Sequence, residues 1–275
     1  MKRFLLILLG GSLLLLLGGW LSRSYFYSQE QTDLPVSLKF EEVVKVEEEE
    51  KNILIVEETP VVEENVILEI EKDEEANERI ETLPLSINLA VPFTPQAPSA
   101  NWDMPYQEAC EEASILMVHA YYQGEEEGLL EASFVETELL NMVAFEENQL
   151  GFSPDMDAQQ ADEFIKAWYG YTKVELLFDP TIEEIKEHLV SGRPVIVPAM
   201  GQQLGNPFFT APGPRYHMLV LRGYTSEGFI TNDPGTKRGK AYLYSFEVIM
   251  NALHDWNEGA IETGQKVIIV IYPNL

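Results

Sequence analysis

Cysteine is almost absent from this sequence: its 275 residues include one, Cys110. A single cysteine excludes an internal disulfide, so packing must stabilise the fold. It also excludes zinc sites built from several cysteines, and the four histidines have neither zinc-ligand spacing nor a His-Glu-x-x-His motif. The sequence therefore predicts neither a metal ion nor another cofactor.

Basic residues are scarce as well. The chain has 18 Lys and Arg against 46 Asp and Glu, which gives a formal net charge of −28. A nucleic-acid partner needs a basic surface for its phosphates, and this composition supplies none. The Gly-x-x-x-x-Gly-Lys-Ser/Thr motif of nucleotide-binding domains is also missing. We therefore expect no nucleic acid among the partners.

One long apolar run covers residues 4–21 and follows Lys2 and Arg3. As a helix it would span about 27 Å, close to the thickness of a bilayer's hydrocarbon core. No small-x-small cleavage site follows the run, so an uncleaved anchor is favoured over a signal sequence. The basic residues ahead of it place the N-terminus in the cytoplasm. We expect residues 1–27 to anchor the chain in the cell membrane, with the remainder extracytoplasmic.

Residues 28–82 form an acidic segment with 5 basic and 19 acidic side chains, hence a net charge of −14. Their short aliphatic pieces, such as Ile53–Val56, show no sustained period, although a partner strand could order one of them. Self-repulsion extends a chain of this kind. We predict a disordered linker here, followed by one globular domain over residues 83–275.

Within the domain, helical patterns come first and strand patterns follow. Helices are predicted near 109–122 and 128–146, after 153–155, from the capping box at Thr181 to Gly192, and near 246–254. Strands are predicted at 193–199, 217–222, 228–232, 240–244 and 266–272. This order predicts an α+β fold in which helices pack on a mostly antiparallel sheet.

Cys110 lies where a coil becomes a helix, in the sequence Gln107-Glu108-Ala109-Cys110. The unpaired N–H groups at a helix start favour a thiolate, which makes this cysteine a candidate nucleophile. The alternative is a small buried apolar residue, the usual role of a free cysteine.

A cysteine nucleophile needs a base, and four histidines are available. His119 lies on the same predicted helix as Cys110 but points to its opposite side. His188 is surrounded by glutamates and is expected on a solvated face, while His254 ends a helix, where the dipole alone favours it. His217, at the start of a strand, remains the candidate base.

Asp233 is the candidate third member of the site. If the strands around residues 217–222 and 228–232 form a hairpin centred near Thr225, residues 217 and 233 are directly opposed. A carboxylate there would fix the tautomer of His217 and stabilise its charged form. The sequence Asn232-Asp233-Pro234-Gly235 is also a turn signal, and the two roles are compatible. Two oxyanion donors are expected: the backbone N–H of Cys110, and the side-chain amide of Gln96 or Gln107.

Several segments carry a resemblance to a known family: Val91–Gln96, Trp102, Ala109–Ser114 with Met117, Gly192–Val197, Tyr216–Val220 and Asn232–Gly235. In this order they resemble the bacterial papain-like cysteine peptidases related to the bacteriocin-leader (double-glycine) peptidases, over about residues 85–275. The resemblance implies a papain-like fold, with the helix that carries the nucleophile packed against the sheet.

It further implies Cys110 as nucleophile, His217 as base and Asp233 as its orienting acid, and it favours Gln96 over Gln107 in the oxyanion hole. Glu111 and Glu112 depart from the Gly-Pro that follows the cysteine in many relatives, and they bring negative charge near a thiolate. If both point away from the sulfur, they only complement the helix start.

The sequence thus predicts a membrane-anchored hydrolase, a thiol protease that acts on a peptide or protein substrate. Two alternatives remain: an acyl transferase or cell-wall amidase with the same three residues, or a catalytically silent binding module.

Overall fold

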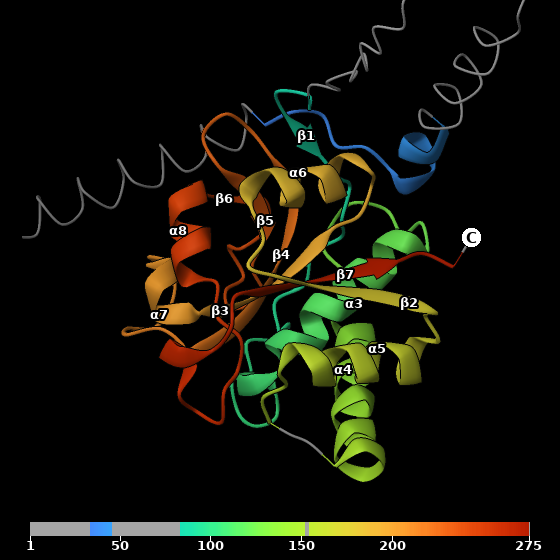
Figure 1. Cartoon of the computed structure of the whole chain (residues 1–275). Coiled ribbons are helices and arrows are strands. Elements are labelled where there is room, and N and C mark those ends of the chain that lie inside the picture. Colours follow the sequence, from blue (N-terminus) through green and yellow to red (C-terminus); the bar gives the residue numbers. More distant parts are fainter. Residues whose placement is uncertain (1–33, 46–82, 152–153, 275) are drawn as a thin grey trace, which may run out of the picture.

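The computed structural model describes residues 34–45, 83–151 and 154–274 (Figure 1). The predicted membrane anchor over residues 1–27 lies outside these ranges. Among the residues that the structure describes, we find no helix with the length and apolarity needed to cross a bilayer.

One antiparallel sheet holds the described domain together (Figure 1). Its strands follow the order β2-β7-β3-β4-β5-β6, and β1 pairs with β4 beside this path. The bounds are β1 Ile87–Asn88, β2 Lys173–Phe178, β3 Val195–Met200, β4 Tyr216–Tyr224, β5 Phe229–Asn232, β6 Tyr242–Tyr244 and β7 Val267–Tyr272. Each pair of neighbouring strands is antiparallel, as predicted.

The helices come mostly before the long strands. Their bounds are α3 Cys110–Tyr122, α4 Ala132–Phe145, α5 Ala158–Tyr169, α6 Ile182–Val190, α7 Gly201–Leu204 and α8 Phe246–Ala252, with a π-helical turn at Glu146–Leu150 and 3-10 turns at Tyr106–Glu108 and Ile261–Thr263. Helix α3 packs against β4, and α4 and α5 lie beside α3 (Figure 1). The predicted α+β class with helices on an antiparallel sheet is therefore confirmed.

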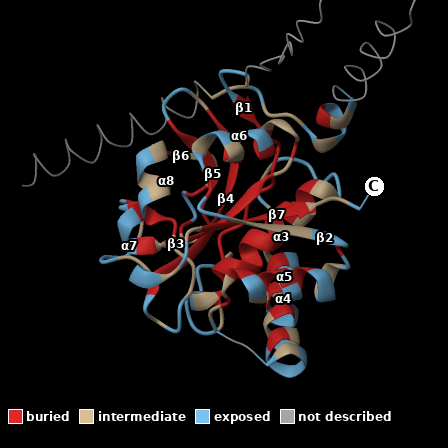
Figure 2. Ribbon diagram, in the orientation of Figure 1, coloured by how far each residue is buried: buried red, intermediate tan, exposed pale blue. Residues whose placement is uncertain are grey.

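The core runs through the middle of the sheet, where Figure 2 shows the buried residues. Every residue of β4 is buried, as are five of the six residues of β3 and of β7. Such strands have neighbours on both faces, and their apolar runs are therefore continuous rather than alternating. Strand β2 was not predicted, because its residues are mostly half-buried and show no clear alternation.

Local capping signals fix two of the helices. The predicted capping box at Thr181 is present, since its hydroxyl accepts from the N–H of Glu184 and the Glu184 side chain accepts from the N–H of Thr181. Gly192, at φ +70°, follows α6 in the left-handed conformation that ends many helices. These signals place α6 within a residue of its predicted ends.

Residues 34–45 pack against the domain, although the sequence places them in the acidic linker. Leu38 forms a parallel bridge with Leu89, with the N–H of Leu38 donating to Asn88 and the N–H of Ala90 donating to Leu38. Val43, on a helical turn over residues 40–45, is 6% exposed and lies over Gly192. The linker prediction thus fails for residues 34–45, because a partner strand orders this piece. The rest of 28–82 lies outside the described residues.

Candidate active site

Cys110 is the first residue of α3, as predicted, and its sulfur faces β4. The N–H of Met218 donates to Cys110 Sγ at 3.4 Å, and Sγ lies 3.0 Å from Oε2 of Glu111. This contact brings the start of α3 next to His217, the residue that precedes Met218 in β4. Only 5% of Cys110 is exposed.

His217 and Asp233 form a buried pair. Nε2 of His217 lies 2.8 Å from Oδ1 of Asp233, and the two side chains are 1% and 0% exposed. Because Nε2 is engaged by the carboxylate, Nδ1 is the ring nitrogen left to exchange a proton with a thiol. In the described chain no hydrogen bond joins Cys110 to His217: the sulfur has Glu111 and Met218 as its partners.

The predicted contact between His217 and Asp233 is present, but the predicted register is wrong. Strands β4 and β5 pair Tyr224 with Phe229, which centres the hairpin between Ser226 and Glu227 rather than near Thr225. Beyond a bulge between Leu221 and Gly223 they pair Val220 with Asn232. Continued past Asn232, this register places Asp233 opposite Leu219. Since residues two apart share a face of a strand, Asp233 still reaches His217 diagonally.

Asp233 has more partners than the sequence suggests. Its Oδ2 accepts from Asn206 Nδ2 at 3.0 Å and from the Tyr244 hydroxyl at 2.6 Å, and its Oδ1 accepts from the N–H of Gly235 at 3.0 Å. Burial by itself would raise the pKa of Asp233, but the charge and hydrogen bond of His217 and these donors hold it below its usual value. The acid is therefore a stable anion that fixes the His217 ring.

Sequence reasoning missed Asn206 and Tyr244. Asn206 lies in Leu204-Gly205-Asn206-Pro207, which carries only a turn signal, and Tyr244 belongs to an ordinary strand pattern. Both come to Asp233 through tertiary packing, from the segment after α7 and from β6 respectively.

Of the two glutamines, the structure brings Gln96 to the site. Gln96 is 3% exposed, and its Nε2 donates to the backbone carbonyls of Tyr106 and Gln107, just ahead of Cys110. Gln107 is exposed, and its side chain donates to Glu108. As the first helical residue, Cys110 has a backbone N–H without an intrahelical acceptor. The amide hydrogens of Gln96 are thus directed at the main chain just ahead of Cys110.

The remaining histidines have other roles. His119 stacks on Tyr169 with ring centroids 3.7 Å apart, and its Nδ1 lies 3.0 Å from the Tyr171 hydroxyl. His254 follows α8, where its Nδ1 lies 3.4 Å from the carbonyl of Ala252. The predicted solvated position of His188 is wrong: the residue is 9% exposed, because β7 and the Arg193 side chain cover it.

Glu111 and Glu112 are both buried, and Glu111 does not point away from the sulfur, so the condition under which the two residues only complement the helix start is not met. Glu111 contacts the sulfur, and Glu112 lies against Glu146 of the π-helical turn. Burial is the largest cause of three raised pKa values: that of Glu111 lies well above its usual range, that of Glu112 is about 7 and that of Glu146 is about 10. The charge of Glu112 adds to the rise for Glu111 and Glu146.

The thiol does not have the lowered pKa that the helix start predicts. Burial raises the pKa of Cys110 well above its usual range, and only the N–H of Met218 opposes this. A helix terminus acts through partial charges, which are weaker than the cost of burying a thiolate beside carboxyl groups. Ionisation of Cys110 therefore depends on a proton acceptor close by.

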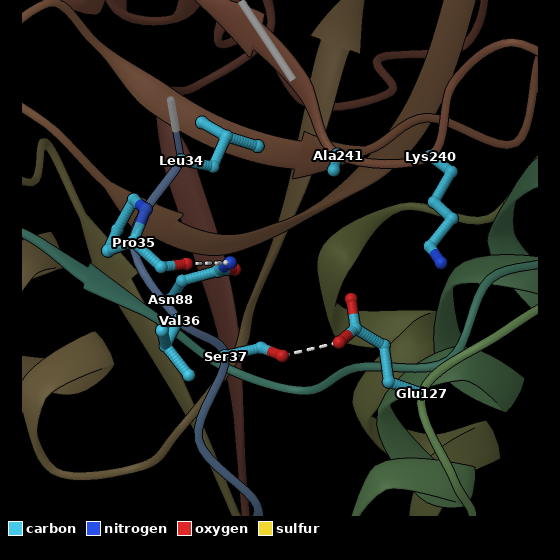
Figure 3. Close-up of a pocket in the computed structure, with 8 residues that line it drawn as sticks. All are labelled: Leu34, Pro35, Val36, Ser37, Asn88, Glu127, Lys240 and Ala241. Carbon is cyan, nitrogen blue, oxygen red and sulfur yellow. Dashed lines mark hydrogen bonds between the residues drawn. The ribbon is translucent and has the colours of Figure 1, made fainter. Parts of the chain in front are cut away.

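A cavity in the described residues lies at a different place (Figure 3). It has a volume of about 380 Å³ and is lined by Leu34–Ser37, Asn88, Glu127, Lys240 and Ala241. Asn88 pairs with Gly223, six residues along β4 from His217, roughly 20 Å at 3.3 Å per residue. The cavity is therefore separate from the Cys110 site.

Gly235 is a close neighbour of the His217 ring. An added Cβ would lie 2.9 Å from His217 Cε1 and 2.8 Å from Phe209 Cε1, both tighter than van der Waals contact. We expect Gly235→Ala to displace the imidazole and lower peptidase activity by about 10- to 100-fold, because small misplacements of reacting groups carry penalties of this size. Steady-state kinetics of the variant would measure this.

Gly128→Ala is the matched control, since an added Cβ there meets nothing within 4 Å. Equal kinetics for both alanine variants would contradict the assigned position of the His217 ring.

Residues 88–259 match the model of a family described as the Peptidase_C39 like family. The match covers more than half of the chain, so the chain belongs to this family. Among solved structures, a Bacillus anthracis protein described as a C39-like peptidase has 17% sequence identity and a TM-score of 0.43, covering 68% of this chain and 98% of that chain. No curated protein matches the chain.

The protein is therefore an enzyme, a cysteine peptidase of the C39-like class. The resemblance seen in the sequence motifs is confirmed. Cys110, His217 and Asp233 all lie within the matched residues.

Proposed function

We propose that the protein is a membrane-anchored, extracytoplasmic peptidase that hydrolyses peptide amide bonds through Cys110, His217 and Asp233. The observation that carries the proposal is the contact of Cys110 Sγ with the N–H of Met218, the residue that follows His217, together with the hold of Asp233 on the His217 ring at 2.8 Å. A nucleophile beside a base, and a base oriented by a buried anion, is the arrangement that thiol acyl transfer requires.

In the first half-reaction, His217 Nδ1 accepts the thiol proton and the sulfur bonds to the substrate carbonyl carbon. The backbone N–H of Cys110 and the amide of Gln96 bind the oxyanion, for which Gln96 must release one of its main-chain acceptors. His217 returns the proton to the departing amine as the C–N bond breaks. A thioester on Cys110 remains.

In the second half-reaction, water attacks the thioester carbonyl and gives a proton to His217. The C–S bond breaks, the carboxylic acid leaves, and the proton returns to the sulfur. Asp233 stays ionised throughout, because its hydrogen-bond donors stabilise the anion.

The location follows from the N-terminal sequence. The apolar run over residues 4–21, preceded by Lys2 and Arg3, supports a single-pass anchor with a cytoplasmic N-terminus. The peptidase domain then lies on the outer side of the membrane, tethered by the acidic segment.

The proposal is tested with the full chain expressed in bacteria. Washed membranes are incubated with a mixture of peptides, and the products are identified by mass spectrometry. We expect new amine and carboxylate ends from amide cleavage, and we expect prior alkylation with iodoacetamide to block it. Membranes that carry the Cys110→Ala chain are the control.

Transfer of the acyl group to an added amine would favour an acyl transferase over a peptidase. Cleavage of peptidoglycan fragments alone would favour a cell-wall amidase. Activity found only in the soluble fraction would overturn the membrane anchor.

A further inference from the structure

A group of buried acids surrounds the sulfur side of α3. We call Glu111, Glu112 and Glu146 the acid cluster; their exposed fractions are 0%, 2% and 0%. Oε2 of Glu112 and both carboxyl oxygens of Glu146 have no hydrogen-bond donor. Two carboxyls in contact can hydrogen-bond to each other only if one is protonated. The cluster thus holds protons that isolated surface glutamates would lose.

The groups that face Glu111 come from four elements. Cys110 and Glu112 share its helix, Glu146 comes from the π-helical turn, Asp155 precedes α5, and Tyr216 belongs to β4. All of them are neutral or negative, and the largest influences on Glu111 include no cation. No cluster of acidic, His or Cys side chains among the described residues could hold a metal ion. The uncharged form of Glu111 is therefore favoured.

The two oxygens of Glu111 have different surroundings. Oε1 accepts from the N–H of Met156 at 3.2 Å, which suits the carbonyl oxygen of a carboxylic acid. Cys110 Sγ donates to Oε2 at 3.0 Å, and at this distance a proton on Oε2 can instead be donated to the sulfur. An ionised Glu111 has no proton there and can only accept the hydrogen of the thiol.

From this geometry we propose that Glu111 is a positioning residue for the nucleophile. It donates a hydrogen bond to the sulfur when neutral, and it accepts the hydrogen of the thiol when ionised. The proposal rests on the proposed function, in which His217 takes the thiol proton. In the neutral state, Glu111 Oε2–H and Met218 N–H both stabilise the thiolate, and Glu111 keeps its proton. In the ionised state, its charge repels the thiolate and its oxygen retains the S–H hydrogen.

This arrangement makes the sulfur more reactive while Glu111 is protonated than after Glu111 has ionised. For an ordinary thiol, reactivity rises with pH as the thiolate forms. Here a rise in pH also ionises Glu111, which removes a donor from the sulfur and adds a negative charge 3.0 Å away. Reactivity is therefore expected to fall over the range in which Glu111 loses its proton.

Glu111→Gln is the informative variant, because the glutamine amide keeps two N–H donors and cannot ionise. The rate of Cys110 alkylation by iodoacetamide is measured from about pH 5 to about pH 9, a range that spans ordinary thiol ionisation. In the wild-type chain we expect the rate to fall by about tenfold or more as Glu111 ionises, and in the variant we expect no such fall. Because Cys110 is the only cysteine, the label reports on this site alone.

Glu163→Gln on α5 is the matched control, because it makes the same chemical substitution at an exposed position. Its profile is expected to equal that of the wild-type chain. If Glu111→Gln fails to fold, the alkylation profile of the wild-type chain is the test. An alkylation rate that only rises with pH contradicts the proposal.

Identical profiles for the wild-type chain and a folded Glu111→Gln chain would also overturn the proposal. These outcomes are separate from a failure of the proposed function, because alkylation measures the sulfur without any peptide cleavage. If the wild-type chain shows the fall in alkylation rate but cleaves no peptide, the result supports the role of Glu111 and contradicts the peptidase mechanism.

Discussion

Replacing Cys110 by alanine is expected to abolish peptide hydrolysis, and replacing His217 by alanine is expected to reduce kcat by about 10³-fold or more. The first change removes the atom that bonds to the substrate. The second removes the base beside a thiol whose pKa is raised by burial, so that almost no thiolate forms without it. Peptide cleavage by the purified full chains in detergent measures both effects.

The double variant sharpens the test, since residues that act as a unit have effects that do not add. We expect the chain with both changes to be no worse than the Cys110→Ala chain. His254→Ala is the control, because the side chain of His254 contacts the carbonyl of Ala252 and its replacement should leave kcat unchanged. Substantial turnover by a folded Cys110→Ala chain would refute the assignment of the nucleophile.

The second large effect concerns stability. The free energy of unfolding is expected to fall as the pH rises from about 5 to about 8, because the acid cluster binds protons more tightly in the folded state. The pKa of Glu112 is raised from 4.5 to about 7. Its contribution to the free energy of unfolding is therefore fully present below pH 4.5 and is lost as the pH rises through 7. The loss for this group is on the order of 3 kcal/mol. Urea denaturation at the two pH values measures it.

Glu146→Gln isolates the source of this pH dependence. Both oxygens of Glu146 lack a hydrogen-bond donor, so its ionised form is destabilising, whereas a glutamine amide can donate to Glu112. We expect the variant to be more stable than the wild-type chain at about pH 8 and similar to it at about pH 5. Glu147→Gln, at the exposed neighbouring position, should change little. Equal destabilisation by Glu146→Gln at both pH values would contradict the prediction.

Local sequence signals predict most of the elements that build the site. The capping box at Thr181, the continuous apolar runs of β3 and β7, and the coil-to-helix change at Cys110 are local, and the structure contains each of them. Elements were missed where the signal is weak. Strand β2 is half-buried without alternation, and β1 consists of two residues.

The contact between His217 and Asp233 could be predicted from the sequence, but its strand register could not. The hairpin argument placed the two residues together, and the observed contact is 2.8 Å. It centred the hairpin near Thr225, whereas the pair Tyr224–Phe229 centres it between Ser226 and Glu227; the bulge between Leu221 and Gly223 then moves the register back by one residue. The contact survives because a shift of two residues keeps a side chain on the same face.

What the sequence by itself determined is the class of the protein, its antiparallel α+β domain, and the identities of Cys110, His217 and Asp233 as the candidate site. Tertiary structure alone decided that Asn206 and Tyr244 hold Asp233, that residues 34–45 pack on the domain, and that Glu111 faces the sulfur. The reason is physical. Periodicity and capping act over a few neighbouring residues, whereas these contacts join segments whose meeting depends on register, packing and the burial of charge.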